Sequence, residues 1–246
     1  EYEQWGWRIP FLIGIAIGFI GFYIRNHCEE SPHYEAAKAE GTLSSTPVRD
    51  VLRFEMAHVA QAIGIYISVT MPFYLLSAYF MTYSEHTLGR SNNEALLLNL
   101  VNMLILLVLA PFSAWVSDKV GRRKVLGLTA IAYFCVAYPV FMLLQQPDFS
   151  TIMLGQALFA VVVAFYIGPV PALLVEIFPT RVRYSGMSMS YNIAAAAFGG
   201  TAPMVCQWLL QTTQDSYSIA YYVMLCAAVS LVSLYFYRDR HDAPLA

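Results

Sequence analysis

The chain has 246 residues, of which 58% are apolar and 12% charged, and its mean hydropathy is +0.54. A soluble domain of this size carries about twice that charged fraction, so the composition excludes an ordinary soluble fold. With 14 Lys and Arg against 16 Asp and Glu, the net charge of −2 gives no reason to expect a nucleic-acid partner. We therefore expect an all-α, polytopic protein embedded in a lipid bilayer.

Seven stretches are apolar and long enough to cross a membrane. A hydrocarbon core about 30 Å thick takes about 20 residues of helix. The first stretch has Arg8 at its mouth, and from the second onward none contains Asp, Glu, Lys or Arg. The predicted spans, in chain order, are residues 7–24, 56–83, 95–116, 125–144, 152–175, 186–210 and 219–237.

Lysine and arginine are distributed unequally between the loops on the two sides of these spans. Only Arg8 and Arg90 fall on one side. Basic loops remain in the cytoplasm, so we predict an external N-terminus and a cytoplasmic C-terminus. The twelve basic residues on the other side are Arg25, Lys38, Arg49, Arg53, Lys119, Arg122, Arg123, Lys124, Arg181, Arg183, Arg238 and Arg240.

One long connection, residues 25–55, follows the first predicted span on the cytoplasmic side. It is mixed in charge, lacks long apolar runs and carries Pro32, Gly41 and Pro47, as linkers between bundles do. We therefore predict three parts: residues 1–24 as the last helix of one bundle, 25–55 as a central linker, and 56–246 as a six-helix bundle.

Two charged motifs lie on the predicted cytoplasmic side. Residues 118–124, DKVGRRK, combine an acid, a turn glycine and arginines that can form bidentate pairs with carboxylates. Residues 176–186, EIFPTRVRYSG, place Glu176 at the membrane edge beside Pro179, which ends a helix. Taken singly, each motif is equally explained as positive charge that fixes topology.

The two motifs together resemble the major facilitator superfamily. WGWRIPF at residues 5–11, RYSG at 183–186, and YN and FGGTAP at 191–192 and 198–203 are similar to its metabolite:proton symporters, which include proline/betaine, α-ketoglutarate, citrate and shikimate carriers. The resemblance covers the whole chain. It implies the C-terminal half of a twelve-helix carrier, cut just before its sixth helix, whose last six helices form two inverted three-helix repeats. The missing N-terminal half is then a partner of this chain. The opening Glu1 in place of Met likewise suggests a piece of a longer protein.

The resemblance implies a cytoplasmic gate, in which charges of the two motifs pair while the carrier faces outward. The alternative remains a topology signal alone. The residues concerned are Asp118, Gly121, Arg122, Arg123, Glu176, Arg181 and Arg183.

Polar side chains inside the spans are candidates for a solute site near the membrane midplane. Hydrogen bonding between helices explains amides equally well, and aromatic rings mostly serve packing, although they can also hold a quaternary ammonium by cation–π attraction. The candidates are Tyr66, Tyr74, Asn99, Asn102, Gln156, Tyr166 and Asn192.

The last six predicted spans hold no embedded carboxylate, Lys or Arg. The proton-binding residue, and any basic groups for a dicarboxylate, should then lie in the missing half. The absence of embedded Lys and Arg in this half favours a zwitterion or a monocarboxylate as solute. The four cysteines have no metal or redox spacing, and no catalytic motif is recognisable. We expect no enzyme, no metal and no cofactor other than the coupling proton.

The function that these features predict is proton-coupled symport of a small organic solute by alternating access, in a bacterial inner membrane. The solute class is a compatible solute such as proline or betaine, or an organic acid. Two alternatives stay open: a truncated or split half-carrier without transport of its own, and a sugar or organic-ion porter of the same superfamily.

Overall fold

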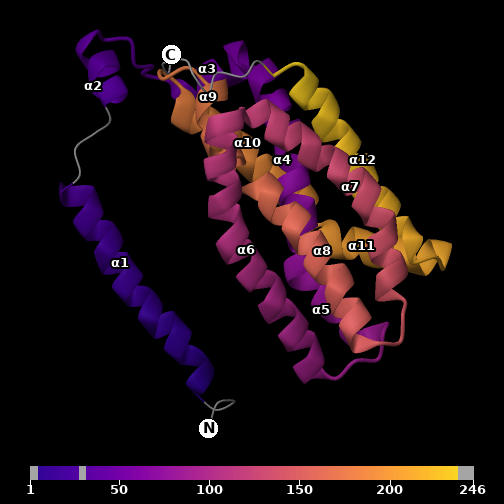
Figure 1. Ribbon diagram of the computed structural model, residues 1–246. Coiled ribbons are helices and arrows are strands. Elements are labelled where there is room, and N and C mark those ends of the chain that lie inside the picture. The colour runs from indigo at the N-terminus through magenta and orange to yellow at the C-terminus, as the bar shows by residue number, and fades with distance from the viewer. Residues whose placement is uncertain (1–4, 28–31, 238–246) are drawn as a thin grey trace. The chain divides into compact units, whose positions relative to one another are not determined.

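The computed structural model describes residues 5–27 and 32–237 (Figure 1). Cys28 and the predicted cytoplasmic residues Arg238 and Arg240 lie outside these ranges. Within them all regular structure is helical, as predicted. Contacts divide the chain into two units, Glu1–Leu43 and Ser44–Ala246.

The first unit contains one apolar helix. A short 3-10 turn, η1 (Gly6–Arg8), leads into α1 (Ile9–His27), and the guanidinium of Arg8 lies 4.3 Å from the centre of the Trp7 ring. A Trp–Arg pair at this position is typical of a membrane interface. The predicted linker contains a short helix here, α2 (Pro32–Ala39), with proline at its first position.

The second unit begins with α3 (Pro47–Phe54), a second helix of the predicted linker, and continues with six spans. Together with Gly6–His27 these make seven helices in the described residues that are long and apolar enough to cross a membrane, which confirms the predicted number. The six spans consist of α4 (Met56–Tyr74), η2 (Leu75–Tyr79) and α5 (Phe80–His86); α6 (Asn92–Val120); α7 (Arg122–Leu144); α8 (Phe149–Ile167) and α9 (Val170–Ile177); α10 (Arg183–Ala194), η3 (Ala195–Gly200) and α11 (Ala202–Thr213); and α12 (Tyr217–Tyr235).

Three of these spans are irregular at positions that their sequences explain. The fifth of the seven spans, Phe149–Ile177, breaks between α8 and α9 at Gly168-Pro169, where a glycine is followed by a residue without an N–H. Pro72 inside α4 likewise has no N–H, so the Ser68 carbonyl lacks its helical donor, and the Tyr133 hydroxyl donates to it instead at 3.3 Å. The π-helical segments η2 and η3 widen the second and sixth spans.

The seven spans are numbered along the chain, with Gly6–His27 as the first. The packing pattern of the last six is the same when the second span is exchanged with the fifth, the third with the sixth and the fourth with the seventh. α4 packs on α12 and on α10 with η3, whereas α8 packs on α7 and α6. The exchanged pair α7 and α12 lie side by side (Figure 1). This symmetry is that of two three-helix repeats, and the first helix of each packs mainly on the other repeat.

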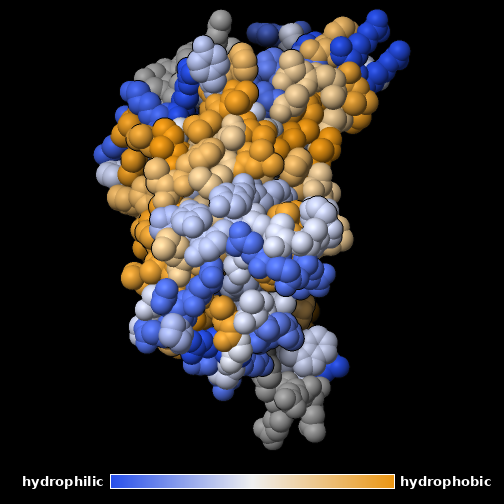
Figure 2. Space-filling model, turned by 90° about the vertical axis from the view of Figure 1, so that its right-hand side faces the viewer, coloured by the Kyte–Doolittle hydropathy of each residue, from blue (hydrophilic) through white to orange (hydrophobic). Residues whose placement is uncertain are grey.

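The outer surface of the bundle is apolar where α7 and α12 form it. Figure 2 shows a broad hydrophobic zone over the upper part of this side, with more polar residues below. Leu128 and Ile131 on α7 and Leu225 and Val232 on α12 are all more than half exposed. Apolar side chains so arranged suit contact with lipid.

Candidate functional site

Both charged motifs come together at one end of the bundle, which we call the basic end. It is formed by residues 44–58, 118–124, 176–185 and 235–237. Gly121 joins α6 to α7 with φ of 106°, a backbone angle that glycine adopts readily and that makes the tight turn between the two helices. Arg122 then begins α7 with its side chain facing the end of α9.

Arg122 forms the more deeply buried ion pair of the basic end. Its Nε lies 2.5 Å from Oε1 of Glu176, and its Nη1 lies 2.9 Å from Oδ1 of Asp118. The side chains of Arg122 and Glu176 are only 13% and 6% exposed. The structure thus brings three of the predicted gate residues into one contact between the third, fourth and fifth spans.

The end of α12 joins this cluster through groups that sequence analysis missed. The Tyr237 hydroxyl donates to Oε2 of Glu176 at 2.6 Å, and Arg123 Nη2 donates to the Tyr235 carbonyl at 2.9 Å. Arg123 therefore contacts the backbone of the last helix. Neither tyrosine carries a charge or belongs to a motif, so no sequence signal pointed to these contacts.

A second ion pair joins the start of α4 to the loop between α9 and α10. Arg181 Nη2 lies 2.9 Å from Oε1 of Glu55, and His58 Nδ1 lies 2.7 Å from Oε2 of the same carboxylate. Glu55 was not among the predicted gate residues, although an acid directly before a span was a signal for it. Arg183 is the first residue of α10, and its Nε donates to the Phe178 carbonyl at 3.1 Å.

Four of the solute-site candidates bond to other helices inside the bundle. Asn102 donates to Gln156 at 2.8 Å, and Gln156 donates to Ser84 at 3.2 Å, all three being buried. The buried Tyr166 hydroxyl donates to the Ile65 carbonyl at 3.1 Å, and Asn99 donates to the Ser77 carbonyl at 3.3 Å. These hydrogen bonds of Asn99, Asn102, Gln156 and Tyr166 are of the interhelical kind.

The other candidates lie on a surface shared by α4 and α10. A pocket of about 470 Å³ is lined by Tyr66 and Asn192 together with Tyr191, and the rings of the two tyrosines meet edge to face at 5.1 Å. Tyr74 lies two turns further along α4, where its ring packs on Gly199 of η3. No lining residue is charged; the remaining ones are Pro171, Leu174, Tyr184, Met187 and Ser188.

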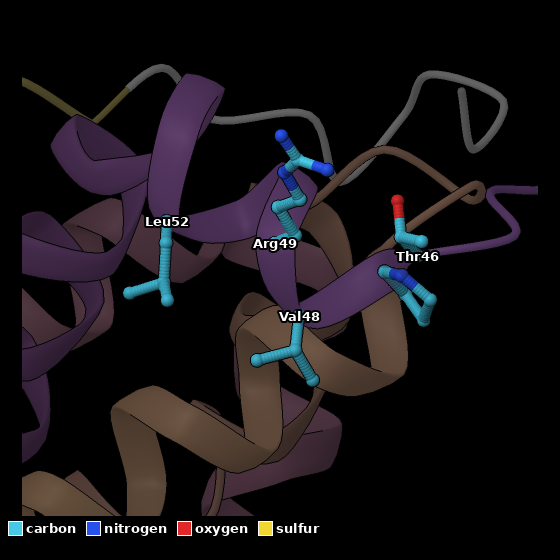
Figure 3. A pocket seen from close by; sticks show the side chains of 5 residues that line it. Thr46, Val48, Arg49 and Leu52 are labelled. Atoms are coloured by element: carbon cyan, nitrogen blue, oxygen red, sulfur yellow. The ribbon is translucent and has the colours of Figure 1, made fainter.

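Two shallow grooves continue this pocket toward the basic end. The first, about 440 Å³, shares Tyr184, Ser188 and Asn192 with the pocket and reaches Val48 of α3. The second, about 490 Å³, lies on α3 itself (Figure 3). In that view Val48 and Leu52 project from one side of α3 and Arg49 from the other. Val48 thus borders both grooves, and Arg49 and Leu52 line the second one.

Among residues 5–27 and 32–237, no group of three or more His, Cys, Asp or Glu is placed to hold a metal ion. The polar groups of the pocket are hydroxyls and one amide, which suit hydrogen bonding with a small solute. Its tyrosine rings suit cation–π contact.

The sequence matches the family described as "Sugar (and other) transporter" over residues 58–239. It is 30% identical to a glycine betaine/proline/ectoine/pipecolic acid transporter, OusA, of Dickeya dadantii, over 99% of this chain and 50% of that protein. It is 30% identical to a proline/betaine transporter of Escherichia coli K12, over 100% of this chain and 51% of that protein. The chain therefore spans about half the length of these curated relatives.

The fold is similar to the crystal structure of a D-xylose-proton symporter. The TM-score is 0.58 at 21% identity, over 94% of this chain and 54% of the symporter. Together with the matched family, this confirms the predicted superfamily and its all-α fold. The chain belongs to the sugar (and other) transporter family of the major facilitator superfamily, a family of membrane transporters.

Proposed function

We propose that the chain is the C-terminal half of a proton-coupled symporter for a small organic solute, with proline- or betaine-like compatible solutes as the favoured class and organic acids as the alternative. The relatives that it matches over its whole length are named for such solutes. The observation that carries the proposal is the uncharged pocket that Tyr66, Tyr191 and Asn192 line.

The chemistry of this pocket fits a zwitterion better than a di- or tricarboxylate. Tyrosine rings attract an ammonium or quaternary ammonium by cation–π interaction, which strengthens where water is excluded. The Ser188 hydroxyl can donate to one carboxylate, and Asn192 beside it donates its Nδ2 to the Ser188 carbonyl at 2.7 Å. A second carboxylate would need a basic group, and none lines the pocket.

Proton coupling and alternating access place further demands on the other half of the carrier. Glu55 and Glu176 lie at the ends of spans, so the titrating residue at the midplane belongs to the N-terminal half in this proposal. The basic end lies on the cytoplasmic side of a bacterial inner membrane, because cytoplasmic loops carry the excess of Lys and Arg. The two halves then rock about the site that they share.

Uptake of radiolabelled proline, glycine betaine, α-ketoglutarate, citrate and shikimate by a carrier-deficient bacterial strain tests the proposal. The strain should express the full-length gene, with and without an uncoupler. We expect uncoupler-sensitive accumulation of proline or betaine. Accumulation that an uncoupler leaves unchanged would contradict proton coupling, and no uptake by protein shown to be in the membrane would favour a half-carrier without transport.

A pair of tyrosine substitutions tests the site itself. Tyr66→Ala should weaken uptake mainly through a higher KM, because it removes one ring of the pocket. Tyr221→Ala removes an exposed tyrosine of α12 that does not line the pocket and serves as the matched control. Equal effects of the two substitutions would assign the solute site elsewhere.

A further inference from the structure

Three amide side chains and one hydroxyl meet where α6 packs on α8 and on α5, and they share no residue with the basic end or the pocket. Asn102 Nδ2 of α6 donates to Gln156 Oε1 of α8 at 2.8 Å, and Gln156 Nε2 donates to Ser84 Oγ of α5 at 3.2 Å. Asn99, one turn before Asn102, donates its Nδ2 to the Ser77 carbonyl at 3.3 Å. We call Ser84, Asn99, Asn102 and Gln156 the amide cluster.

Two oxygens of the amide cluster have no hydrogen-bond partner among residues 5–27 and 32–237. They are Oδ1 of Asn99 and Oδ1 of Asn102, and both atoms are buried. Turning the Asn99 amide would only bring its oxygen against the Ser77 carbonyl, so the acceptor of Asn99 is fixed. A buried acceptor without a donor carries the full cost of losing its hydration, and lipid supplies no donor. Both oxygens therefore require a donor from a bound molecule.

The two unpartnered oxygens belong to side chains on one face of α6. Side chains three residues apart on a helix have Cβ atoms about 5–6 Å apart, a distance that one small molecule with two donors bridges. Asn102 lies about 15 Å along α6 from Asn92, well below the end of the bundle. A molecule at this depth is bound inside the protein, since Asn102 is only 1% exposed.

The ligand that fits these atoms is a water molecule. Water has one O–H group for each of the two oxygens, and buried waters typically make about two to four hydrogen bonds. Ser84 can supply a further bond, because its hydroxyl accepts from Gln156 and keeps its own proton to donate. A cation also binds amide oxygens, but no residue of the amide cluster is charged, and a buried ion without a counter-charge loses its hydration uncompensated.

We propose that the amide cluster is a binding site for one water molecule, which donates to Oδ1 of Asn99 and to Oδ1 of Asn102. The water completes the hydrogen bonding between α5, α6 and α8 in the part of the bundle away from the basic end. Asn99, Asn102 and Gln156, which we predicted as candidates for the solute site, then hold this water and not the solute.

Hydroxyl-radical footprinting of the full-length carrier in water enriched in oxygen-18 tests the site. X-ray irradiation converts a bound water into radicals that oxidise its immediate neighbours, and the isotope identifies oxygen that came from water. The reporters are Phe80, one turn from Ser84, and Phe159, one turn from Gln156, whose rings are buried and 5.5 Å apart. We expect oxygen-18 on at least one of these rings.

Two leucine substitutions separate this water from any other. Asn102→Leu removes one of the two oxygens and should abolish the label on both rings. Gln61→Leu is the matched control, because this amide of α4 donates to the Ser233 carbonyl outside the amide cluster, and it should leave the label unchanged. If Asn102→Leu does not fold, Asn99→Leu removes the other oxygen and should abolish the label in the same way.

Three outcomes would overturn the proposal. Unlabelled rings in the unaltered carrier would mean a dry core, in which the two amides contact each other directly. A label that persists in the asparagine variants would assign the water to another place. A melting temperature that rises when Na⁺ replaces choline in the unaltered carrier, but not in Asn102→Leu, would identify a cation instead of water. None of these results depends on uptake, so a failure of the proposed transport function leaves the test of this site intact.

Discussion

Arg122 is a largely buried cation whose positive charge is compensated by carboxylates from two helices, α6 and α9. Glu176 approaches its Nε and Asp118 its Nη1, but only Glu176 is itself buried. Removing one partner of a buried pair leaves the other charge uncompensated, which typically costs about 3–5 kcal/mol, whereas an exposed pair contributes about 1 kcal/mol or less.

We therefore expect Glu176→Gln to destabilise the carrier strongly and Asp118→Asn to change its stability little. Thermal unfolding of the purified full-length protein in detergent measures both, and the neutral amides keep the side-chain volumes. Equal losses for the two variants would show that exposure does not distinguish the two carboxylates.

Sequence analysis predicted that charges of the two motifs pair, and Arg122 with Glu176 is such a pair, but it did not predict the contacts that Glu55 and Tyr237 make. The motifs identified Arg122, Glu176 and Arg181 as residues, because acid–turn–base patterns are local. Glu55 and Arg181 are 126 positions apart, and Glu176 and Tyr237 are 61 apart. Such contacts depend on how helices pack, and Tyr237 contributes a hydroxyl that no charge pattern reveals.

At the scale of elements, Pro72 and Tyr133 illustrate how one helix compensates a defect in another. The Tyr133 hydroxyl of α7 supplies the hydrogen bond that Pro72 denies to the Ser68 carbonyl of α4. A buried carbonyl without a donor costs about 1–3 kcal/mol.

Tyr133→Phe should accordingly destabilise the protein by about 1–3 kcal/mol. In a Pro72→Ala background the same change should cost less, because an alanine at that position donates its own N–H to the Ser68 carbonyl. A double-mutant cycle of unfolding free energies measures the difference. Strict additivity would mean that the two residues do not share the carbonyl.

The crossing of α6 and α8 depends on a residue without a side chain. A Cβ at Gly168 would collide with Ser113 Oγ and the Ala110 carbonyl of α6, and Ser113 Oγ donates to the Ala164 carbonyl of α8 at 3.1 Å. The backbones therefore approach closely at this point, as small residues allow in membrane helices.

Gly168→Ala should force α6 and α8 apart and lower stability by about 1–3 kcal/mol. Gly127→Ala on α7 is the control, because a Cβ there meets nothing within 4 Å, and it should be neutral or slightly stabilising. Unfolding in detergent compares the two variants. A neutral result at position 168 would show that the crossing tolerates a methyl group.

The helices themselves were well predicted because apolar length is a property of the local sequence. The third span, for example, was expected at residues 95–116 and occupies Asn92–Val120, the difference being charged and polar turns at its ends. The short helices α2 and α3 were missed, since eight residues of mixed charge show no span-length pattern. The burial of Asn102 and Gln156 inside the bundle was likewise not readable, because a polar residue on a helix does not reveal its neighbour.

At the scale of the whole molecule, the six spans of the second unit differ in how far the unit covers them. In the most apolar stretch of the second span 67% of residues are buried, against 22% in the third and in the sixth. The third and sixth spans exchange under the symmetry of the bundle, so the uncovered surface is itself symmetric. This surface includes the pocket at Tyr191 and the groove at Ile193.

We expect the N-terminal half to cover the face of the sixth span that carries Ile193, whereas Leu225 on α12 stays in lipid. Spin labels on Ile193→Cys and Leu225→Cys in the full-length carrier measure this by collision with oxygen dissolved in the bilayer. The label at position 193 should be shielded and that at 225 accessible. Equal accessibility would contradict an interface on this face.

The exchange of partners between the two repeats also has a consequence for synthesis. α4 finds its main contacts on α10 and α12, so the second span leaves the ribosome more than a hundred residues before its partners exist. Until Arg183 and the residues that follow are made, the face of α4 that packs on α10 and α12 must be covered by lipid, by the insertion machinery or by temporary neighbours. A nascent chain stalled before that point should be the species that membrane quality control recognises, because the face of α4 that packs on α10 and α12 is still uncovered.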